Sequence, residues 1–216
     1  MKNILFMLAG GLLLFASCSK DDSDTEQTKD YVQLKTGNYW VYRLSNVDTL
    51  GVETITDSYD SVYVSGDTTI NGNVFTKKYH TWLFYSNTPD CLRDSSNYLV
   101  SPNGRKMFSP VNFSDTLIKS YNVISYTDTT TLDDDTLFFY FYKMSDKGMS
   151  LTVPAGTFIT MDFKGTFIPY GSYANALKTI YSHNYYAKKI GLIQYSSTFA
   201  NSRTQMVWKL VRYKVN

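Results

Sequence analysis

Residues 150–165 read SLTVPAGTFITMDFKG, and this stretch determines the fold class predicted for the whole chain. Apolar residues alternate with polar ones in its second half, which is the period of a half-buried β-strand. We expect Ile159, Met161 and Phe163 to face a core while Thr160, Asp162 and Lys164 face water. Before that strand, Pro154 presets φ and Gly156 tolerates positive φ, so this segment predicts a tight turn between two antiparallel strands.

The composition extends the same prediction to the rest of the chain. The sequence contains 19 Tyr, 13 Phe and 3 Trp, residues that suit a pleated, half-buried surface. We therefore expect an all-β fold, a single antiparallel, strongly curved sheet or incompletely closed barrel. A two-sheet β-sandwich is the alternative. No Pro-, Gly- or Ser-rich linker divides residues 30–216, which predicts one all-β domain there.

Further strands are expected at residues 39–44, 54–65, 74–85, 97–100, 106–108, 184–195 and 205–215. The pairs Gly66-Asp67 and Asn71-Gly72 predict turns, and the second pair is a strong hairpin signal. Residues 137–142 (LFFYFY) form a continuous apolar run, which predicts a central strand buried on both faces. Residues 172–180 show a short helical period, although nine residues make a marginal helix.

The first 18 residues determine the expected location of the protein. A basic start, an apolar run at residues 4–15 and small residues before Cys18 describe a signal peptide over residues 1–17. The apolar run is too short to span a bilayer as a helix. Phe15-Ala16-Ser17-Cys18 resembles a lipobox, so we expect Cys18 to carry acyl chains such as palmitate, which would hold the protein to a membrane. An ordinary secretory leader is the alternative.

A polar segment follows the cysteine. Residues 18–29 contain almost no apolar side chains, so we expect a flexible tether. Within it, Lys20, Asp21 and Asp22 resemble the surface-export signal of Bacteroidota lipoproteins. This places the protein in the outer membrane, facing the cell exterior. A plain solvated tether, with the protein on the periplasmic face, is the alternative.

Charge and cysteine content exclude two further classes. With 21 Lys and Arg against 19 Asp and Glu, the chain has no basic excess that would indicate a nucleic-acid partner. If Cys18 is acylated, Cys91 has no cysteine to pair with in this chain. A disulfide framework is therefore not expected, and Cys91 is interpreted as a small buried residue.

Four segments in order carry a family resemblance: LKTGNYWVY at residues 34–42, VPAGTF at 153–158, YYAKKIGLI at 185–193 and WKLVRY at 208–213. Together they resemble a family of β-rich outer-membrane lipoproteins of Bacteroidota, although Gln33 stands where that pattern has Pro. The resemblance implies a lipid-anchored antiparallel β-fold and supplies no catalytic residues. Among these segments, Pro154, Gly156 and Gly191 are interpreted as structural turn or bulge positions.

No sequence motif for catalysis is present, so we do not expect an enzyme or a cofactor. His80 and His183 are too few for a typical zinc site and are interpreted as sheet-edge or core residues. Asp128 with Asp133, Asp134 and Asp135 is the best candidate for calcium, although a solvated hairpin is the simpler interpretation. Trp40, Trp82 and Trp208 are expected in the core.

These observations favour a non-enzymatic role for a lipid-anchored protein of the cell envelope. In that role the chain binds a glycan, a peptide or another small molecule. The alternative is a structural or assembly partner within an outer-membrane complex. Exposed aromatic faces would support the first role, because such faces stack on sugar rings and mark contact patches.

The lipid anchor is directly testable. Cys18→Ala should abolish labelling by a clickable fatty acid, because the acyl chains need this thiol. The protein should accumulate as unprocessed precursor or as soluble material, measured by gel mobility and fractionation. Equal labelling of both forms would contradict acylation at Cys18.

Overall fold

The computed structural model describes residues 26–82, 88–128, 131–198, 202 and 204–216, and of these the side chains at 125–128, 131–134 and 198 are not described. It contains one short α-helix, α1 (Thr28–Val32), and one 3-10 turn, η1 (Gly171–Tyr173). The strands are β1 (Tyr39–Asp48), β2 (Glu53–Ile70), β3 (Asn73–His80), β4 (Asp90–Ser95), β5 (Tyr98–Val100), β6 (Lys106–Phe108), β7 (Ile118–Asp128), β8 (Thr131–Val153), β9 (Gly156–Pro169), β10 (Ile180–Ser182), β11 (Asn184–Ala187), β12 (Gly191–Thr198) and β13 (Thr204–Lys214).

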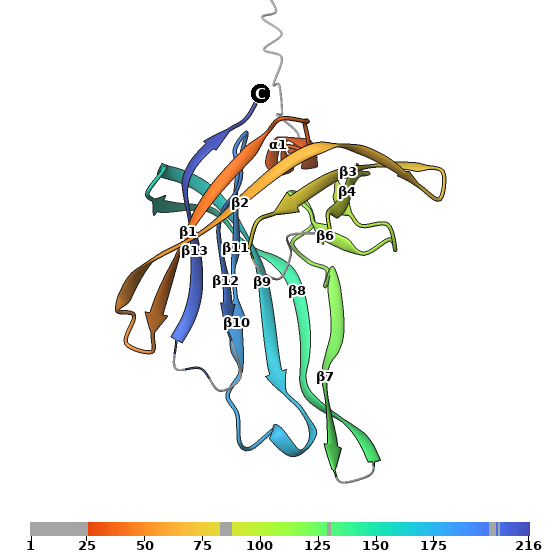
Figure 1. The fold of residues 1–216 in the computed structure, drawn as a ribbon, viewed down its shortest axis with the longest axis vertical. Helices are drawn as coiled ribbons and strands as arrows, with labels where there is room; N and C mark the ends of the chain where they lie inside the picture. Colours follow the sequence, from red (N-terminus) through yellow and green to blue (C-terminus); the bar gives the residue numbers. More distant parts are fainter. Residues whose placement is uncertain (1–25, 83–87, 129–130, 199–201, 203) are drawn as a thin grey trace, which may run out of the picture.

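All of these strands belong to one antiparallel sheet that curls into a nearly closed barrel (Figure 1). The strand order is β6-β5-β4-β3-β2-β1-β13-β12-β11-β9-β8-β7, with β10 added beside β9. The two ends of this order, β6 and β7, flank a seam that the ladder does not seal. This confirms the expected single curved sheet, and the sandwich alternative is not observed.

Two apolar clusters fill the fold. The first is centred on β1, β12 and β13 and contains Trp40 and Trp208, with Trp82 packed against it in an edge contact of 4.8 Å to Trp208. The second joins α1 to both sides of the seam, and Phe108 of β6 and Met144 of β8 are buried together in it. Side-chain packing therefore closes the seam where backbone hydrogen bonds do not.

The helix α1 covers one end of the barrel (Figure 1). Thr28 is fully buried, and Tyr31 packs on Phe108 with ring centroids 5.8 Å apart. The Tyr31 hydroxyl donates to Glu26, and the carbonyl of Asp30 accepts from the Lys189 amide. Residues 26–29, the end of the expected tether, therefore lie against the fold, because burial of α1 offsets their ordering entropy.

The hairpin expected at Asn71-Gly72 is confirmed. Asn71 and Gly72 have φ of 50° and 74° and connect β2 to β3, as an Asn-Gly turn with two positive φ angles requires. The segment with Gly104 connects β5 to β6. The prediction of a turn at Gly66-Asp67 is wrong. Both residues lie inside β2, where the register shifts at Gly66 and the backbone forms a bulge.

The predicted helix at residues 172–180 is also wrong. Only η1 is helical there, and the segment ends in β10. Residues 174–176 are exposed, so a helix at this place would have no apolar surface to bury.

Strand β9 departs from the predicted alternation. Met161 and Phe163 are core residues as expected, but Ile159 is 64% exposed, because at this end of the hairpin it is the neighbouring Phe158 that packs against the first cluster. Thr160 and Asp162, expected in water, are fully buried. Hydrogen bonds make this possible, since the Thr160 hydroxyl donates to the Met149 carbonyl at 2.9 Å and Asp162 pairs with His183.

Residues 137–142 lie in β8, next to the edge strand β7, and they are not buried on both faces. Phe138 is the one residue of the six that is fully buried. One face of this run packs in the barrel through Tyr140 and Tyr142. The other face carries Phe139 and Phe141, which are half-buried.

Gly165 is a point where the fold depends on the absence of a side chain. A Cβ at this position would lie 2.4 Å from the Ser182 hydroxyl and 2.6 Å from the Tyr142 ring. The hydroxyl of Ser182 donates to that of Tyr142 at 3.1 Å, so both groups are held in place. Gly165 therefore allows β10 and the Tyr142 ring to meet over β9.

Gly165→Ala should lower the free energy of unfolding by about 1–3 kcal/mol, because neither neighbour can move freely away from an added methyl group. Urea unfolding followed by fluorescence would measure this. Thr157→Ala, at an exposed position of the same strand, is the control and should change the value by less than about 0.5 kcal/mol. Equal effects of the two substitutions would contradict close packing at Gly165.

Candidate functional site

The outer face of strands β7–β10 presents aromatic and lysine side chains to solvent. Residues paired directly across neighbouring strands point to the same side of a sheet. The register therefore places one set of side chains on this face: Lys119, Tyr121, Phe139, Phe141, Lys143, Lys164, Thr166, Ile168 and Tyr181. We call this set, together with the adjoining Tyr170, the aromatic–lysine face. The opposite side of the same strands faces the second apolar cluster.

Three tyrosines of this face are half exposed. The exposed fractions are 51% for Tyr121, 48% for Tyr170 and 45% for Tyr181. Tyr121 contacts Phe139 and Tyr170 with ring centroids 5.4 and 5.3 Å apart. These contacts fix the rings against one another, so the face presents ordered aromatic surface to solvent.

The three lysines give the face a positive charge. The Lys164 amine lies 4.5 Å from the centroid of the Tyr181 ring, a cation–π contact. Lys119 and Lys143 are exposed. Within the described part of the chain, none of the three forms an ion pair with a carboxylate.

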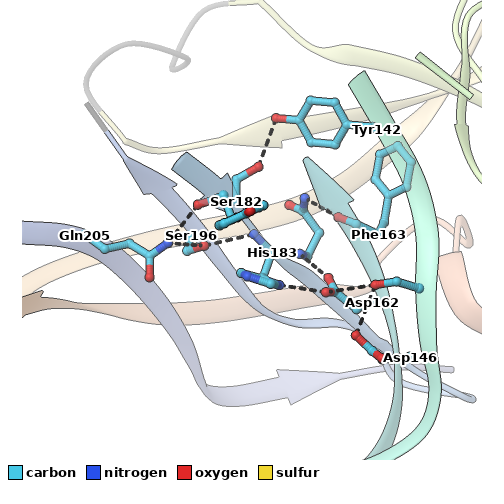
Figure 2. A network of polar contacts seen from close by, with 11 residues as sticks. Tyr142, Asp146, Asp162, Phe163, Ser182, His183, Ser196 and Gln205 are labelled. Atoms are coloured by element: carbon cyan, nitrogen blue, oxygen red, sulfur yellow. Dashed lines mark hydrogen bonds and ion pairs between the residues drawn. The ribbon is translucent and has the colours of Figure 1, made fainter. Parts of the chain in front are cut away.

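A polar network borders this face at one end (Figure 2). The fully buried Asp162 accepts from His183 Nδ1 at 2.6 Å, from the Asn184 amide at 3.2 Å and from the Ser145 hydroxyl at 3.3 Å. The His183 ring stacks on Tyr185 with centroids 5.6 Å apart. Burial, together with the charge of Asp162, raises the pKa of Tyr185 to about 12.

The network in Figure 2 continues to the neighbouring strands. The Ser196 hydroxyl accepts from the His183 amide at 3.0 Å and from the Gln205 side chain at 3.1 Å. These bonds connect β12 and β13 to the start of β11. They hold the edge of the aromatic–lysine face in a fixed position.

A second aspartate–histidine pair lies inside the barrel. Asp60 is fully buried and accepts from His80 Nδ1 at 2.9 Å, from the Tyr195 hydroxyl at 3.0 Å, and from the amides of Thr81 and Trp82 at 3.0 Å each. His80 Nε2 lies 3.5 Å from Asp90. In both pairs, therefore, an aspartate binds a histidine and also the backbone just after it.

The ionisation of this second pair follows from its contacts. Burial alone would lower the pKa of His80, but hydrogen bonds to Asp60 and Asp90 outweigh it and raise that pKa. Burial alone would raise the pKa of Asp60, and the hydrogen bonds from His80, Tyr195 and the Trp82 amide outweigh it and lower that pKa. Both shifts favour the imidazolium form of His80 and the carboxylate form of Asp60.

The barrel interior beside this pair is nearly filled. A cavity of about 20 Å³ lies between α1 and the strands, lined by Lys78, Tyr42, Tyr186 and apolar side chains. This volume holds about one water molecule. Burial lowers the pKa of Lys78 and raises that of Tyr42. This cavity has no space for a larger ligand, and we take the outer face as the candidate site.

The residues predicted from sequence are distributed as follows. Cys18, Lys20, Asp21 and Asp22 lie outside the described residues, as do the side chains of Asp128, Asp133 and Asp134. Asp135 accepts a hydrogen bond from the Ser172 hydroxyl at 3.0 Å. No cluster of three metal-ligating side chains occurs within the ranges that the structure describes, and the calcium hypothesis stays a prediction.

The predicted turn positions lie at strand ends. Pro154 is in the two-residue connection between β8 and β9, and Gly156 after it has φ +139°. Gly191 has φ +101°, and a Cβ there would lie 3.5 Å from the Trp40 ring. The indole of Trp40 donates to the Ile190 carbonyl at 2.7 Å, beside this glycine.

Two features of the site were missed by sequence reasoning. The sequence placed Asp162 in water and residues 137–142 in the core, whereas Asp162 is buried and Phe139 and Phe141 lie on the outer face. The sequence contains one signal for the burial of Asp162, because this residue stands between Met161 and Phe163, which are both core residues.

No helix among the described residues is both long enough and apolar enough to cross a membrane.

No protein-family model matches the chain, and no curated protein sequence does. Among solved structures, the chain is similar to a candidate exported protein with a YmcC-like fold from Bacteroides fragilis. That match has 13% identity and a TM-score of 0.49 and covers 85% of this chain and 98% of the other. A candidate lipoprotein from Parabacteroides distasonis is 16% identical with a TM-score of 0.38, covering 88% of this chain and all of the other. These likenesses are too distant to assign a function.

The His80 pair predicts a pH dependence of stability. Because its pKa in the folded protein is raised above 6.5, protonated His80 contributes stability that is fully present below that value and is lost as pH rises through the raised pKa. The free energy of unfolding, measured with urea at about pH 6 and pH 8.5, should therefore decrease more in the wild type than in His80→Gln. An equal decrease in both proteins would contradict the ion pair.

Proposed function

We propose that this chain is a lipid-anchored protein of the cell envelope with a non-enzymatic binding role. The observation that carries the proposal is the aromatic–lysine face, where half-exposed tyrosines share one side of the sheet with three lysines that form no ion pair to a described carboxylate. Exposed aromatic patches of this kind mark contact sites, because their burial against a ligand removes apolar surface from water. The ligand binds by side-chain contact on a rigid sheet.

The location follows from the leader. Acylation at Cys18 anchors the chain to the outer membrane, and Lys20, Asp21 and Asp22 direct it to the outer face. Eight residues lead from Cys18 to Glu26, which reach at most roughly 26–29 Å when extended. The α1 end of the barrel is therefore held near the membrane.

This anchoring leaves the binding face accessible. In Figure 1 the far ends of β7 and β8, together with η1, lie at the end of the molecule opposite α1. Tyr121 and Tyr170 belong to that half of the sheet. The aromatic part of the face is therefore directed away from the bilayer, toward molecules outside the cell.

The polar networks support a non-enzymatic role. Asp60 and Asp162 each accept backbone amides and a histidine within the fold, so their carboxylates stabilise the connections between strands. This use explains both buried pairs as structural contacts. The proposal therefore assigns no catalytic residue.

A second candidate function is assembly with another envelope protein. It is favoured by β7, an 11-residue strand at one end of the sheet order that has β8 as its one neighbour. An edge strand presents unpaired backbone groups that can add a strand from a partner. In this role the partner would occupy the edge of the sheet instead of its face.

The binding role is tested with the full chain in detergent on glycan and peptide arrays. Tyr121→Ala should weaken binding of any ligand found by about tenfold, because one aromatic contact contributes about 1 kcal/mol or slightly more. Tyr59→Ala is the matched control, since Tyr59 is 50% exposed but lies on β2. Thermal unfolding would establish that both variants fold.

Three outcomes would contradict the proposal. Equal binding by Tyr121→Ala and wild type would place the site elsewhere. No array binding, together with partner proteins crosslinked through β7, would favour assembly. Turnover of a substrate would show that the chain is an enzyme.

A further inference from the structure

We infer that the ligand of the aromatic–lysine face is an acidic polysaccharide, a chain of sugar units that carry carboxylate groups. The inference rests on the proposed binding function and specifies its ligand class. Three observations support it: the charge of the face, the orientation of its rings, and the pairing of the backbone beneath it.

The charge of the face calls for an anionic ligand. Lys119 of β7, Lys143 of β8 and Lys164 of β9 occupy neighbouring positions in the register. In the described ranges no carboxylate forms an ion pair with them. Asp162, two positions before Lys164 in β9, is buried and already bound to His183. An anion on this face would therefore supply the missing partner for the lysines.

The aromatic side chains call for a ligand with flat, weakly polar C–H surfaces. Tyr121, Tyr170 and Tyr181 expose about half of their surface, and the hydroxyl groups of Tyr121 and Tyr170 can exchange hydrogen bonds with a ligand. The face of an aromatic ring carries a negative potential and attracts the polarised C–H groups of a sugar ring. Sugar units that also carry carboxylates can contact the tyrosine rings through their C–H groups and the lysines through their carboxylates.

The backbone beneath the face argues against an extended peptide. β8 and β9 are paired on both sides, with β7 and β11 as the outer neighbours. Their amides and carbonyls therefore cannot add a strand from a peptide, which is the usual basis of peptide affinity on a sheet. Recognition over β8 and β9 therefore depends on side chains, and a face that extends across neighbouring strands suits a chain-like ligand.

The position of the face argues against the bilayer as its partner. Anionic lipid headgroups also attract lysine and tyrosine side chains. The acylated Cys18, however, is connected to the α1 end, and in Figure 1 the end of β9 and η1, which flank Tyr170, lie at the opposite end. The membrane that holds the anchor is therefore not the surface that this face contacts.

Polygalacturonate, a polymer of sugar carboxylates, is the probe, and dextran is the neutral comparison. The full chain in detergent should bind polygalacturonate and not dextran, and the affinity should fall as salt concentration rises. Lys143→Gln and Lys164→Gln should each weaken binding about threefold, and the double variant about tenfold, because each exposed ion pair contributes up to about 1 kcal/mol. Biolayer interferometry measures these dissociation constants.

Lys214→Gln is the matched control, because Lys214 is an exposed lysine at the end of β13. It should bind polygalacturonate like the wild type. Thermal unfolding of every variant establishes that weaker binding does not result from unfolding.

The outcomes separate this inference from the proposed function. If Tyr121→Ala weakens dextran binding while the lysine variants bind normally, the face binds a neutral glycan and the acidic ligand class is wrong. If vesicles with anionic lipids bind in a lysine-dependent way and polygalacturonate does not, the partner is a membrane surface and the inference is wrong. If no probe depends on Tyr121 or on the lysines, the proposed function fails as well.

Discussion

The pairing of β1 with β13 is the contact on which the rest of the structure depends. It runs from Tyr39 opposite Lys214 to Asp48 opposite Thr204. Without it the strand order would separate into two sheets, β6 to β1 and β13 to β7. The same pairing brings Tyr42 and Trp208 into the first apolar cluster, so a single ladder supplies both the continuity of the sheet and the centre of its core.

Local features of this fold could be predicted from the sequence because their causes are local. The Asn71-Gly72 turn depends on two backbone angles that these residues favour, and the structure has them. The tryptophans are large and apolar enough to be core residues in almost any arrangement of strands. The curved all-β sheet could be expected because segments of aromatic and β-branched residues follow one another without a linker.

The binding face and the buried carboxylates could not be predicted, because they depend on contacts distant in sequence. The histidines that bind Asp60 and Asp162 lie 20 and 21 residues away in the sequence. No local sequence pattern shows that these residues meet in the fold. Residues 137–142 have the composition of a buried strand. Their exposure depends on whether another layer covers them, and the sequence of one strand contains no information about that layer.

The β1–β13 pairing also determines when the chain can fold. The Trp40 indole donates to the carbonyl of Ile190, which follows it by 150 residues. Tyr39 of β1 pairs with Lys214 of β13, which is farther still along the chain. Contacts of such long range form slowly, since the entropy of closing a long loop opposes them. The barrel cannot be completed before β13 has been synthesised. The order of the strands therefore keeps the sheet open until its second half has formed.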